Sequence, residues 1–254
     1  GPGRMAEVSK VLSTIEKNIG RNSKPSNLPL IGISVLVTAG PTQEKIDAVR
    51  YLTNYSSGKM GYAIAKHCQK LGADVCLISG PTSISPPEKV RIVNVKSAEE
   101  MYNAVMENAA NSRLIIKSAA VSDFRVEEPN PQKTKKTESL TLKLVKNKDI
   151  LKELGKIKNE KQFLVGFAAE SQNVENYARQ KLKEKNLDLI VANNILQKDA
   201  GFDVDTNRVL LIDEESETQL PLLSKEEVAV QILDHILAQK KWTATSKTTQ
   251  KCEL

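Results

Sequence analysis

Short runs of aliphatic residues alternate with longer amphipathic segments through most of this chain. The runs have the length and β-branched content of buried strands, and the longer segments repeat apolar residues at helical spacing. Strands are predicted at 33–37, 75–78, 90–95, 114–116, 163–166 and 187–191, and helices at 58–71, 98–108, 150–157, 174–185 and 225–238. This alternation predicts an α/β fold, namely a Rossmann-like, doubly wound and mainly parallel sheet with helices on both faces.

Some segments fall outside the simple alternation. Residues 140–145 alternate in polarity and predict an outer strand, while 209–212 and 219–222 predict a late hairpin. Residues 129–137 are polar, rich in lysine and bounded by prolines at 129 and 131, which predicts a mobile loop.

The ends of the chain are expected to lie outside the main domain, which we place at residues 31–239. Apolar positions within 7–19 predict one amphipathic helix, and residues 20–29, with their Asn, Ser and Pro, are typical of a linker. Residues 240–254 are predicted to form a flexible C-terminal tail.

Composition narrows the class of protein. The 254 residues are 40% hydrophobic, which allows a sizeable core, and no apolar run approaches the roughly 20 residues that a transmembrane helix needs. The N-terminus lacks the apolar stretch of a secretion signal. Three cysteines, Cys68, Cys76 and Cys252, form an odd and sparse set that argues against a disulfide framework. We therefore expect a cytoplasmic protein with no membrane partner.

The net charge of +6, from 37 Lys+Arg against 31 Asp+Glu, raises the alternative of a basic nucleic-acid-binding module. Lysines and acids are interleaved along most of the chain, however, and aromatic residues make up only 4%, too few for an evident stacking platform. The local excesses, at 133–136 and at Lys181, Lys183 and Lys185, are more typical of sites for small anions, with an ordinary basic surface as the alternative. We expect no nucleic-acid partner.

Ligands of a doubly wound sheet bind beyond the carboxyl ends of its strands, so the residues that leave each strand are the candidates. Gly40 follows the first strand, and Ser56, Ser57 and Gly58 open the next helix. Hydroxyls and a glycine at a helix start make a cradle for an anion, because unpaired N–H groups and the helix dipole point outward there. The alternative is that Ser56 or Ser57 only caps the helix, and the sequence favours neither, since both roles use the same N–H groups.

Two further strand exits have the residues of a nucleotide site. Residues 118–123 are small up to Asp123, so a planar base can approach the backbone, and the Asp123 carboxylate suits ribose hydroxyls or Mg²⁺. Phe167 follows another strand, where its ring can wall a base. Lys181 and Lys185 share one predicted helix face, and a bound polyanion would explain that like-charge pair. Tight packing for the small residues and a solvated face for the lysines stay open as alternatives.

Familiar catalytic signatures are absent from the sequence. A Walker P-loop requires glycine where Thr53 stands and Ser or Thr where Met60 stands, and the glycines of the dinucleotide fingerprint do not follow Gly40. His67 and His235 fall in predicted helices with no nucleophile elbow nearby, and no Cys/His spacing indicates zinc. An NAD(P)-dependent oxidoreductase on the same architecture stays open as a rival, weakened by the missing fingerprint.

Taken together, several long motifs resemble bacterial phosphopantothenoylcysteine synthetase and occur in that family's order over about residues 33–237. They are Val37-Thr38-Ala39-Gly40-Pro41-Thr42, Arg50-Tyr51-Leu52-Thr53-Asn54-Tyr55-Ser56-Ser57-Gly58-Lys59-Met60-Gly61, Ala119-Ala120-Val121-Ser122-Asp123, Gly166-Phe167-Ala168-Ala169-Glu170 and Ala192-Asn193.

Residues 1–7 are similar to the last substrate-clamp motif of the partner decarboxylase, which bacteria usually fuse to the synthetase. The chain thus resembles the synthetase half of a bifunctional parent, with residues 1–30 as a remnant of the preceding decarboxylase domain and a linker. Gly1 and Pro2 have a second interpretation, as residues left by cloning.

The resemblance implies a ligase of coenzyme A biosynthesis that joins 4′-phosphopantothenate to L-cysteine. In the implied reaction, the carboxylate attacks the α-phosphorus of CTP to give an acyl cytidylate and pyrophosphate, and the cysteine amine then displaces CMP to form the amide. CTP and Mg²⁺ are the implied co-substrate and cofactor, a homodimer is the implied assembly, and FMN is implied only for the decarboxylase domain.

The family's site residues carry over where the motifs match. Asn54 is implied to hold the acyl cytidylate, Arg50 to support the same pocket, and Lys133 to be the catalytic lysine of a flexible flap that closes over the intermediate. Gly40, Ser56, Ser57 and Gly58 are candidates for substrate or phosphate binding, and Asp123 is the candidate Mg²⁺ ligand. Nucleotide contacts are expected at Ser118, Ala119, Ala120, Asp123, Lys133, Lys148, Asp149, Ile150, Leu151, Phe167, Lys181 and Lys185.

One motif departs from the family. The family usually has Lys-Asn-Pro-Asp where this chain has Lys146-Asn147-Lys148-Asp149. Loss of the proline predicts a less rigid loop and leaves the individual role of Lys148 open.

Overall fold

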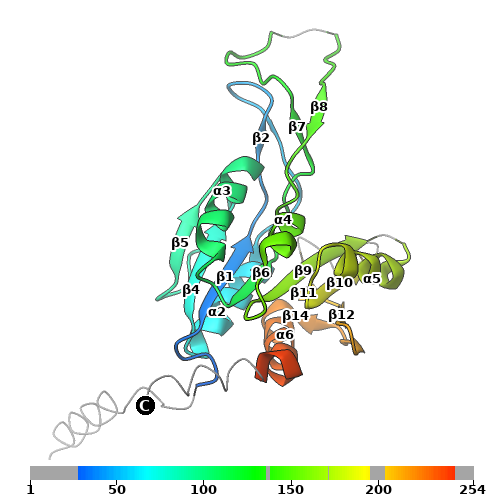
Figure 1. The fold of residues 1–254 in the computed structure, drawn as a ribbon. Coiled ribbons are helices and arrows are strands. Elements are labelled where there is room, and N and C mark those ends of the chain that lie inside the picture. Colours follow the sequence, from blue (N-terminus) through cyan, green and yellow to red (C-terminus); the bar gives the residue numbers. More distant parts are fainter. Residues whose placement is uncertain (1–27, 136–137, 171, 195–203, 244–254) are drawn as a thin grey trace, which may run out of the picture.

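The computed structural model of this protein describes residues 28–135, 138–170, 172–194 and 204–243. The helix predicted at 7–19 and most of the predicted linker lie outside these residues. The centre of the fold is one eight-stranded sheet (Figure 1). From one edge to the other its strands are β5 (Arg91–Asn94), β4 (Asp74–Ser79), β1 (Ser34–Ala39), β6 (Leu114–Lys117), β9 (Phe163–Glu170), β10 (Leu189–Asn194), β12 (Val209–Ile212) and β13 (Glu217–Gln219).

The first six of these strands are parallel, and the last two add an antiparallel edge. The chain runs outward from β1 to β4 and β5 and then crosses back to β6 on the other side of β1. The strand order therefore reverses between β1 and β6, the topological switch point at which sheets of this kind bind ligands. The predicted Rossmann-like, mainly parallel fold is confirmed.

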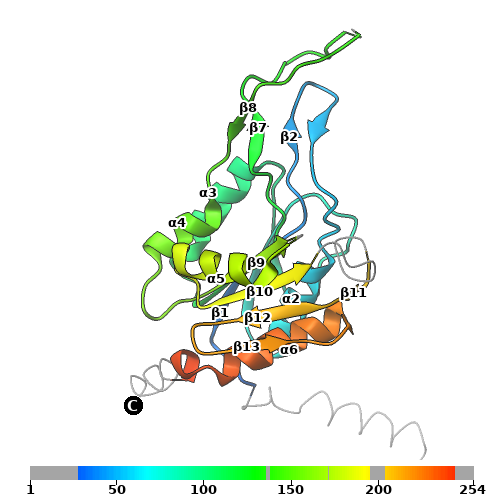
Figure 2. The same cartoon turned by 90° about the vertical axis from the view of Figure 1, so that its right-hand side faces the viewer.

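Helices cover both faces of the sheet (Figures 1 and 2). One face is covered by α2 (Lys59–Lys70) and α6 (Lys225–Ala238), which also contact each other. The other is covered by α3 (Ala98–Ala109), α4 (Ile150–Ile157) and α5 (Val174–Glu184). Strand residues alternate between the two faces, so each face has its own buried apolar cluster, with Leu77 in one and Ile78 in the other. None of the described helices is long and apolar enough to cross a membrane.

Two short hairpins extend from the sheet as a projection that we call the arm (Figure 1). The arm consists of β2 (Glu44–Lys45) and β3 (Tyr51–Leu52) together with β7 (Phe124–Val126) and β8 (Leu144–Lys146) and the described residues of the loops that connect them. The predicted strand at 140–145 is thus shorter than expected and begins at Leu144. Part of the loop predicted at 129–137 is anchored, since Asn130 N donates to Ile46 O at 2.9 Å.

The C-terminal part differs from its prediction in two places. The second strand of the late hairpin lies at β13 rather than at 219–222, because Leu220 is buried and β14 (Leu223–Ser224) pairs instead with β11 (Thr206–Asn207). Residues 240–243, expected to belong to the tail, are described and packed: Trp242 is 4% exposed and its ring meets Phe163 edge to face. The rest of the predicted tail lies outside the described residues.

Candidate active site at the switch point

Two adjoining cavities lie at the carboxyl ends of the central strands. The first, of about 430 Å³, is bordered by the start of α2 and the loop after β6, and we call it the α2 cavity. The second, of about 580 Å³, lies between the same loop and the start of α4, and we call it the α4 cavity. Residues common to both linings are Lys117, Val121, Ser122, Asp123, Phe167 and Lys181.

The start of α2 faces the α2 cavity without a side-chain cap. Gly58, not a serine, is the N-cap, with a φ of 82° that favours glycine, and as a glycine it has no side chain to cap the first turn. The alternative that Ser56 or Ser57 caps this helix is therefore wrong. A Cβ on Gly61 would lie 2.6 Å from Ala39 Cβ, so glycine lets the helix start approach the end of β1 closely. An uncapped helix N-terminus beside a cavity is a natural site for an anion.

The loop after β6 is held in place by the exit of β1. Ala119 N donates to Thr38 Oγ1 at 3.1 Å, and Ala120 N donates to Gly40 O at 3.0 Å. Gly40 itself does not line either cavity among the described residues; its φ is 77° and a Cβ there would lie 3.0 Å from Gly80 O. Gly40 therefore shapes the wall behind the site.

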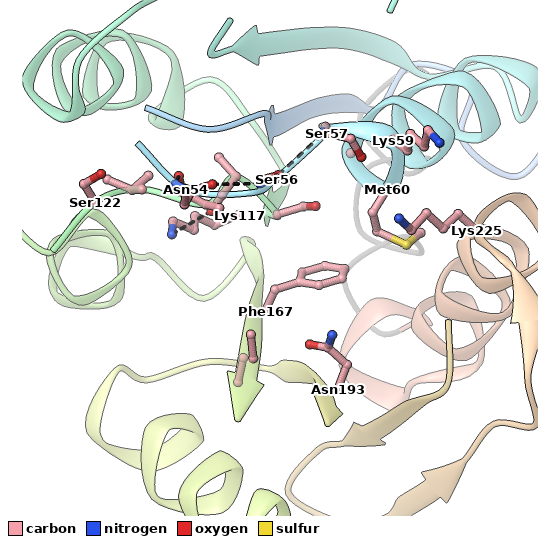
Figure 3. A pocket seen from close by; sticks show the side chains of 18 of the residues that line it. Asn54, Ser56, Ser57, Lys59, Met60, Lys117, Ser122, Phe167, Asn193 and Lys225 are labelled. Atoms are coloured by element: carbon pink, nitrogen blue, oxygen red, sulfur yellow. Dashed lines mark hydrogen bonds between the residues drawn. The ribbon is translucent and has the colours of Figure 1, made fainter. Parts of the chain in front are cut away.

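Hydrogen bonds to both ends of the side-chain amide fix the orientation of Asn54 (Figure 3). Its Nδ2 donates to Ala120 O at 2.6 Å, and its Oδ1 accepts from Ser56 N at 3.0 Å. The side chain lines the α2 cavity opposite Phe167 and Asn193. Such a fixed, neutral amide is suited to hold a carbonyl or phosphate oxygen without adding charge.

The α4 cavity contains a charged pair at the start of α4. Asp149 caps this helix by accepting from Lys152 N at 3.0 Å, and Lys185 Nζ lies 2.8 Å from Asp149 Oδ2. Burial raises the pKa of Asp149, but the hydrogen bonds from Lys185 and Lys152 outweigh it and hold the pKa below its ordinary value. The Asp149 carboxylate therefore stays ionised beside Lys185.

Lys148, which replaces the family proline, is exposed, and its Nζ lies 4.5 Å from the centre of the Tyr102 ring on α3. This cation–π contact ties the loop before α4 to α3. Lys148 also lines the α4 cavity, so its side chain is placed to contact either the Tyr102 ring or a ligand in that cavity.

Arg50 and Lys133 line neither cavity; both belong to the arm. Arg50 Nε donates to Asp47 Oδ2 at 2.9 Å, and its Nη2 donates to Thr134 O at 3.2 Å, next to Lys133. The hydrogen bonds from Arg50 hold the pKa of Asp47 well below its usual range. Arg50 and Lys133 are thus neighbours on the arm, separate from the other predicted site residues.

All the remaining candidates line one or both cavities. They are Asn54, Ser56, Ser57, Gly58, Ser118, Ala119, Ala120, Asp123, Lys148, Asp149, Ile150, Leu151, Phe167, Lys181 and Lys185. The sequence interpretation missed Lys117, Asn193 and Lys225, which also line the α2 cavity. A lysine directly after Leu114-Ile115-Ile116 was a usable signal for Lys117, because that residue ends a buried central strand.

Asp123 is the carboxylate that both cavities share. The described residues contain no group of three or more His, Cys, Asp or Glu that could hold a metal ion by itself. Mg²⁺ is commonly held by one or two carboxylates together with the phosphates of a nucleotide, and Asp123 fits that arrangement.

The sheet order and the two cavities define a Rossmann-like domain with a polar ligand site at its switch point. A family model described as "DNA/pantothenate metabolism flavoprotein C-terminal domain" matches residues 30–239. The chain belongs to this family.

Known relatives agree with this assignment. The chain is 44% identical over 239 residues to "Coenzyme A biosynthesis bifunctional protein CoaBC" of Vibrio vulnificus (strain YJ016), covering 93% of this chain and 58% of that protein. It is 46% identical over 246 residues to the protein of the same name from Bacillus subtilis (strain 168), covering 96% and 60%. A crystal structure of the C-terminal domain of a CoaBC protein superposes with a TM-score of 0.72 at 45% identity, covering 83% of this chain and 97% of that one. The chain thus spans a little under two thirds of the length of these curated relatives.

Proposed function

We propose that this chain is the ligase part of a bifunctional coenzyme A biosynthesis protein, joining 4′-phosphopantothenate to L-cysteine with CTP. The observation that carries the proposal is the convergence of Asn54, Asp123 and Lys181 on one cavity at the switch point, in a member of this family. The names of the relatives support coenzyme A biosynthesis as the pathway.

The chemical problem in this reaction is to bring a carboxylate against a triphosphate, two anions that repel each other. The site supplies cations and N–H donors on both sides: the start of α2 and Lys181 in the α2 cavity, and Lys185 in the α4 cavity. Such preorganised groups stabilise the charge of the bound phosphates and hold the acid in line, so positioning and electrostatics supply the rate enhancement.

The two half-reactions can be assigned to particular residues of the site. The carboxylate attacks the α-phosphorus, pyrophosphate leaves, and the acyl cytidylate is held by the Asn54 amide and the backbone of Ala119 and Ala120. The cysteine amine next attacks the acyl carbon and CMP leaves. Phe167, shared by both cavities, provides an apolar wall for the base. Asp123 would hold Mg²⁺, which offsets the charge of the phosphates.

The arm supports a homodimer in which a second copy completes the site. Arg50 and Lys133 lie on the arm, away from the cavities, and large apolar side chains are exposed there. These exposed residues are Val49, Tyr51, Phe124, Leu140 and Leu144, from 44% to 59% exposed. Large apolar side chains exposed on one projection are typical of an interface, and a second copy bound there would be placed to receive both cations.

Pyrophosphate release tests the proposal. The chain is incubated with 4′-phosphopantothenate, Mg²⁺ and each of the four nucleoside triphosphates, with cysteine omitted. Release that depends on the acid and is fastest with CTP is expected, and added cysteine should convert the product to the amide. If none of the four nucleotides supports pyrophosphate release, or if release does not depend on the acid, the proposal is refuted.

The two rivals give different results. An NAD(P)-dependent oxidoreductase would bind NAD(P) in calorimetry, and a nucleic-acid-binding module would bind oligonucleotides with a steep salt dependence. The cysteines favour a reducing compartment such as the cytoplasm, because Cys68 and Cys76 are both free and buried.

A further inference from the structure

Lys117 occupies a central position in the sheet that the reaction described above does not use. It is the last residue of β6, paired in register with Thr38 of β1 and Gly166 of β9. It therefore lies at the switch point itself, on the strand at which the order reverses. Lysine is unusual at the end of a strand whose other three residues are fully buried, because it must be desolvated.

The side chain reaches the junction of the two cavities. Lys117 is one of the six residues that line both. Its Nζ donates to Ala119 O at 3.0 Å, while Asn54 donates to Ala120 O, the next carbonyl along the same loop. Figure 3 shows the two side chains on the same side of the α2 cavity. An ammonium has three donors, so the bond to Ala119 O steers the group without using its full capacity.

We propose that Lys117 is a further substrate-binding residue, whose ammonium binds the phosphoryl group that links the nucleoside part of the substrate to the acid. The inference rests on the proposed function. Because Lys117 lines both cavities, a ligand that extends from one cavity into the other passes its ammonium, and in an acyl cytidylate the central group is the phosphoryl group. A cation there stabilises the negative charge that develops as the acyl phosphate bond forms and breaks.

The charged surroundings of Lys117 add a measurable consequence. Burial, together with the positive charges of Lys185 at the end of α5 and Lys181 on α5, lowers the pKa of Lys117 to about 8. Asp149 at the start of α4 and Asp123 on the loop after β6 raise it, without cancelling the effect of burial. A bound polyanion favours the protonated amine, so ligand binding and proton uptake are coupled at this residue.

Calorimetry on the wild-type chain gives the first test. CTP with Mg²⁺ is titrated at pH 8 in two buffers of different ionisation enthalpy, where the terminal phosphate is already fully ionised. Lys117 is then about half protonated, so uptake of about half a proton per nucleotide is expected. Proton uptake that is the same in the wild-type chain and in Lys117→Met would overturn the inference while leaving the proposed function intact. If no nucleotide binds and no pyrophosphate is released, the proposed function fails and this inference falls with it.

Variants provide the second test. Lys117→Met should bind CTP about 10- to 100-fold more weakly and lose the proton uptake, since a charge-assisted hydrogen bond is removed. Lys117→Arg should recover much of the affinity without the uptake, because arginine stays charged at pH 8. Lys156→Met is the control: this exposed lysine on α4 pairs with Glu153 and lines neither cavity. Wild-type affinity and uptake in Lys117→Met would overturn the inference.

Discussion

Asn54→Asp is the sharpest test of the proposed active site, because it changes one group and keeps the shape of the side chain. The amide Nδ2 that donates to Ala120 O at 2.6 Å becomes a carboxylate oxygen. Two acceptors then face each other, so a hydrogen bond worth about 1 kcal/mol is lost and the loop after β6 loses a restraint.

The larger effect falls on the substrate. A negative charge at residue 54 faces the cavity that is proposed to hold phosphate and carboxylate groups. For anions about 5 Å apart at an effective dielectric constant of about 20, Coulomb repulsion is about 3 kcal/mol. That energy corresponds to a rate lower by on the order of 100-fold. The free energy of unfolding should fall by only about 1 kcal/mol.

The assay follows amide formation from CTP, 4′-phosphopantothenate and cysteine, with urea denaturation in parallel. Asn108→Asp is the matched control, because Asn108 Nδ2 also donates to a backbone carbonyl, Ala104 O at 2.7 Å, but lines neither cavity. The control should keep wild-type activity. A wild-type rate in Asn54→Asp, or an equal loss in Asn108→Asp, would refute the reasoning.

Three further predictions concern the arm, the antiparallel edge and the C-terminal packing. Lys133→Gln should release pyrophosphate when cysteine is absent but form little amide when it is present; full amide formation would contradict the role of the flap. Burial raises the pKa of Asp213, but the hydrogen bonds from Ser216, His235 and Glu215 lower it further than burial raises it, so its stabilising contribution is complete above the ordinary carboxyl pKa of 3.8 and is lost as the pH falls from there through the lower pKa of the folded state. Asp213→Asn should therefore be less stable than wild type in urea at pH 7, with a difference that shrinks at about pH 3.5; an equal difference at both pH values would contradict this. Trp242→Ala should reduce the free energy of unfolding by about 3–5 kcal/mol, since the buried ring contacts Phe163 and Arg113; wild-type stability would show that the C-terminal turn does not contribute to the core.

Periodicity was sufficient for the parts of the fold that bury apolar side chains. The β-branched run at 33–37 predicted β1, and the helix predicted at 58–71 is α2, followed by Gly72 with a φ of 93°. Most of the arm was not predictable in this way; only β8 was anticipated, as a longer strand at 140–145. The strands of the arm have two or three residues each and are held by pairing with one another, so they leave almost no apolar pattern in the sequence.

The candidate site shows the same division. Residues that directly follow strands were found because the carboxyl ends of parallel strands meet at one edge of a sheet. Lys225 was missed because it lies in the first turn of a helix that begins with a Ser224/Glu227 capping box. A lysine at such a position is typical of an ordinary solvent-exposed residue. Its place in the α2 cavity follows only from the packing of α6 beside α2, which no local pattern specifies.

The arm also has a consequence for how activity depends on dilution. If its cations serve the cavities of another copy, a lone chain retains its sheet and its nucleotide pocket but not a complete set of reacting groups. Turnover per chain should then fall once the concentration drops below the self-association constant, while the circular dichroism spectrum stays constant. The lowest concentration at which the protein works would be set by how tightly two arms hold each other, independently of its affinity for any small molecule.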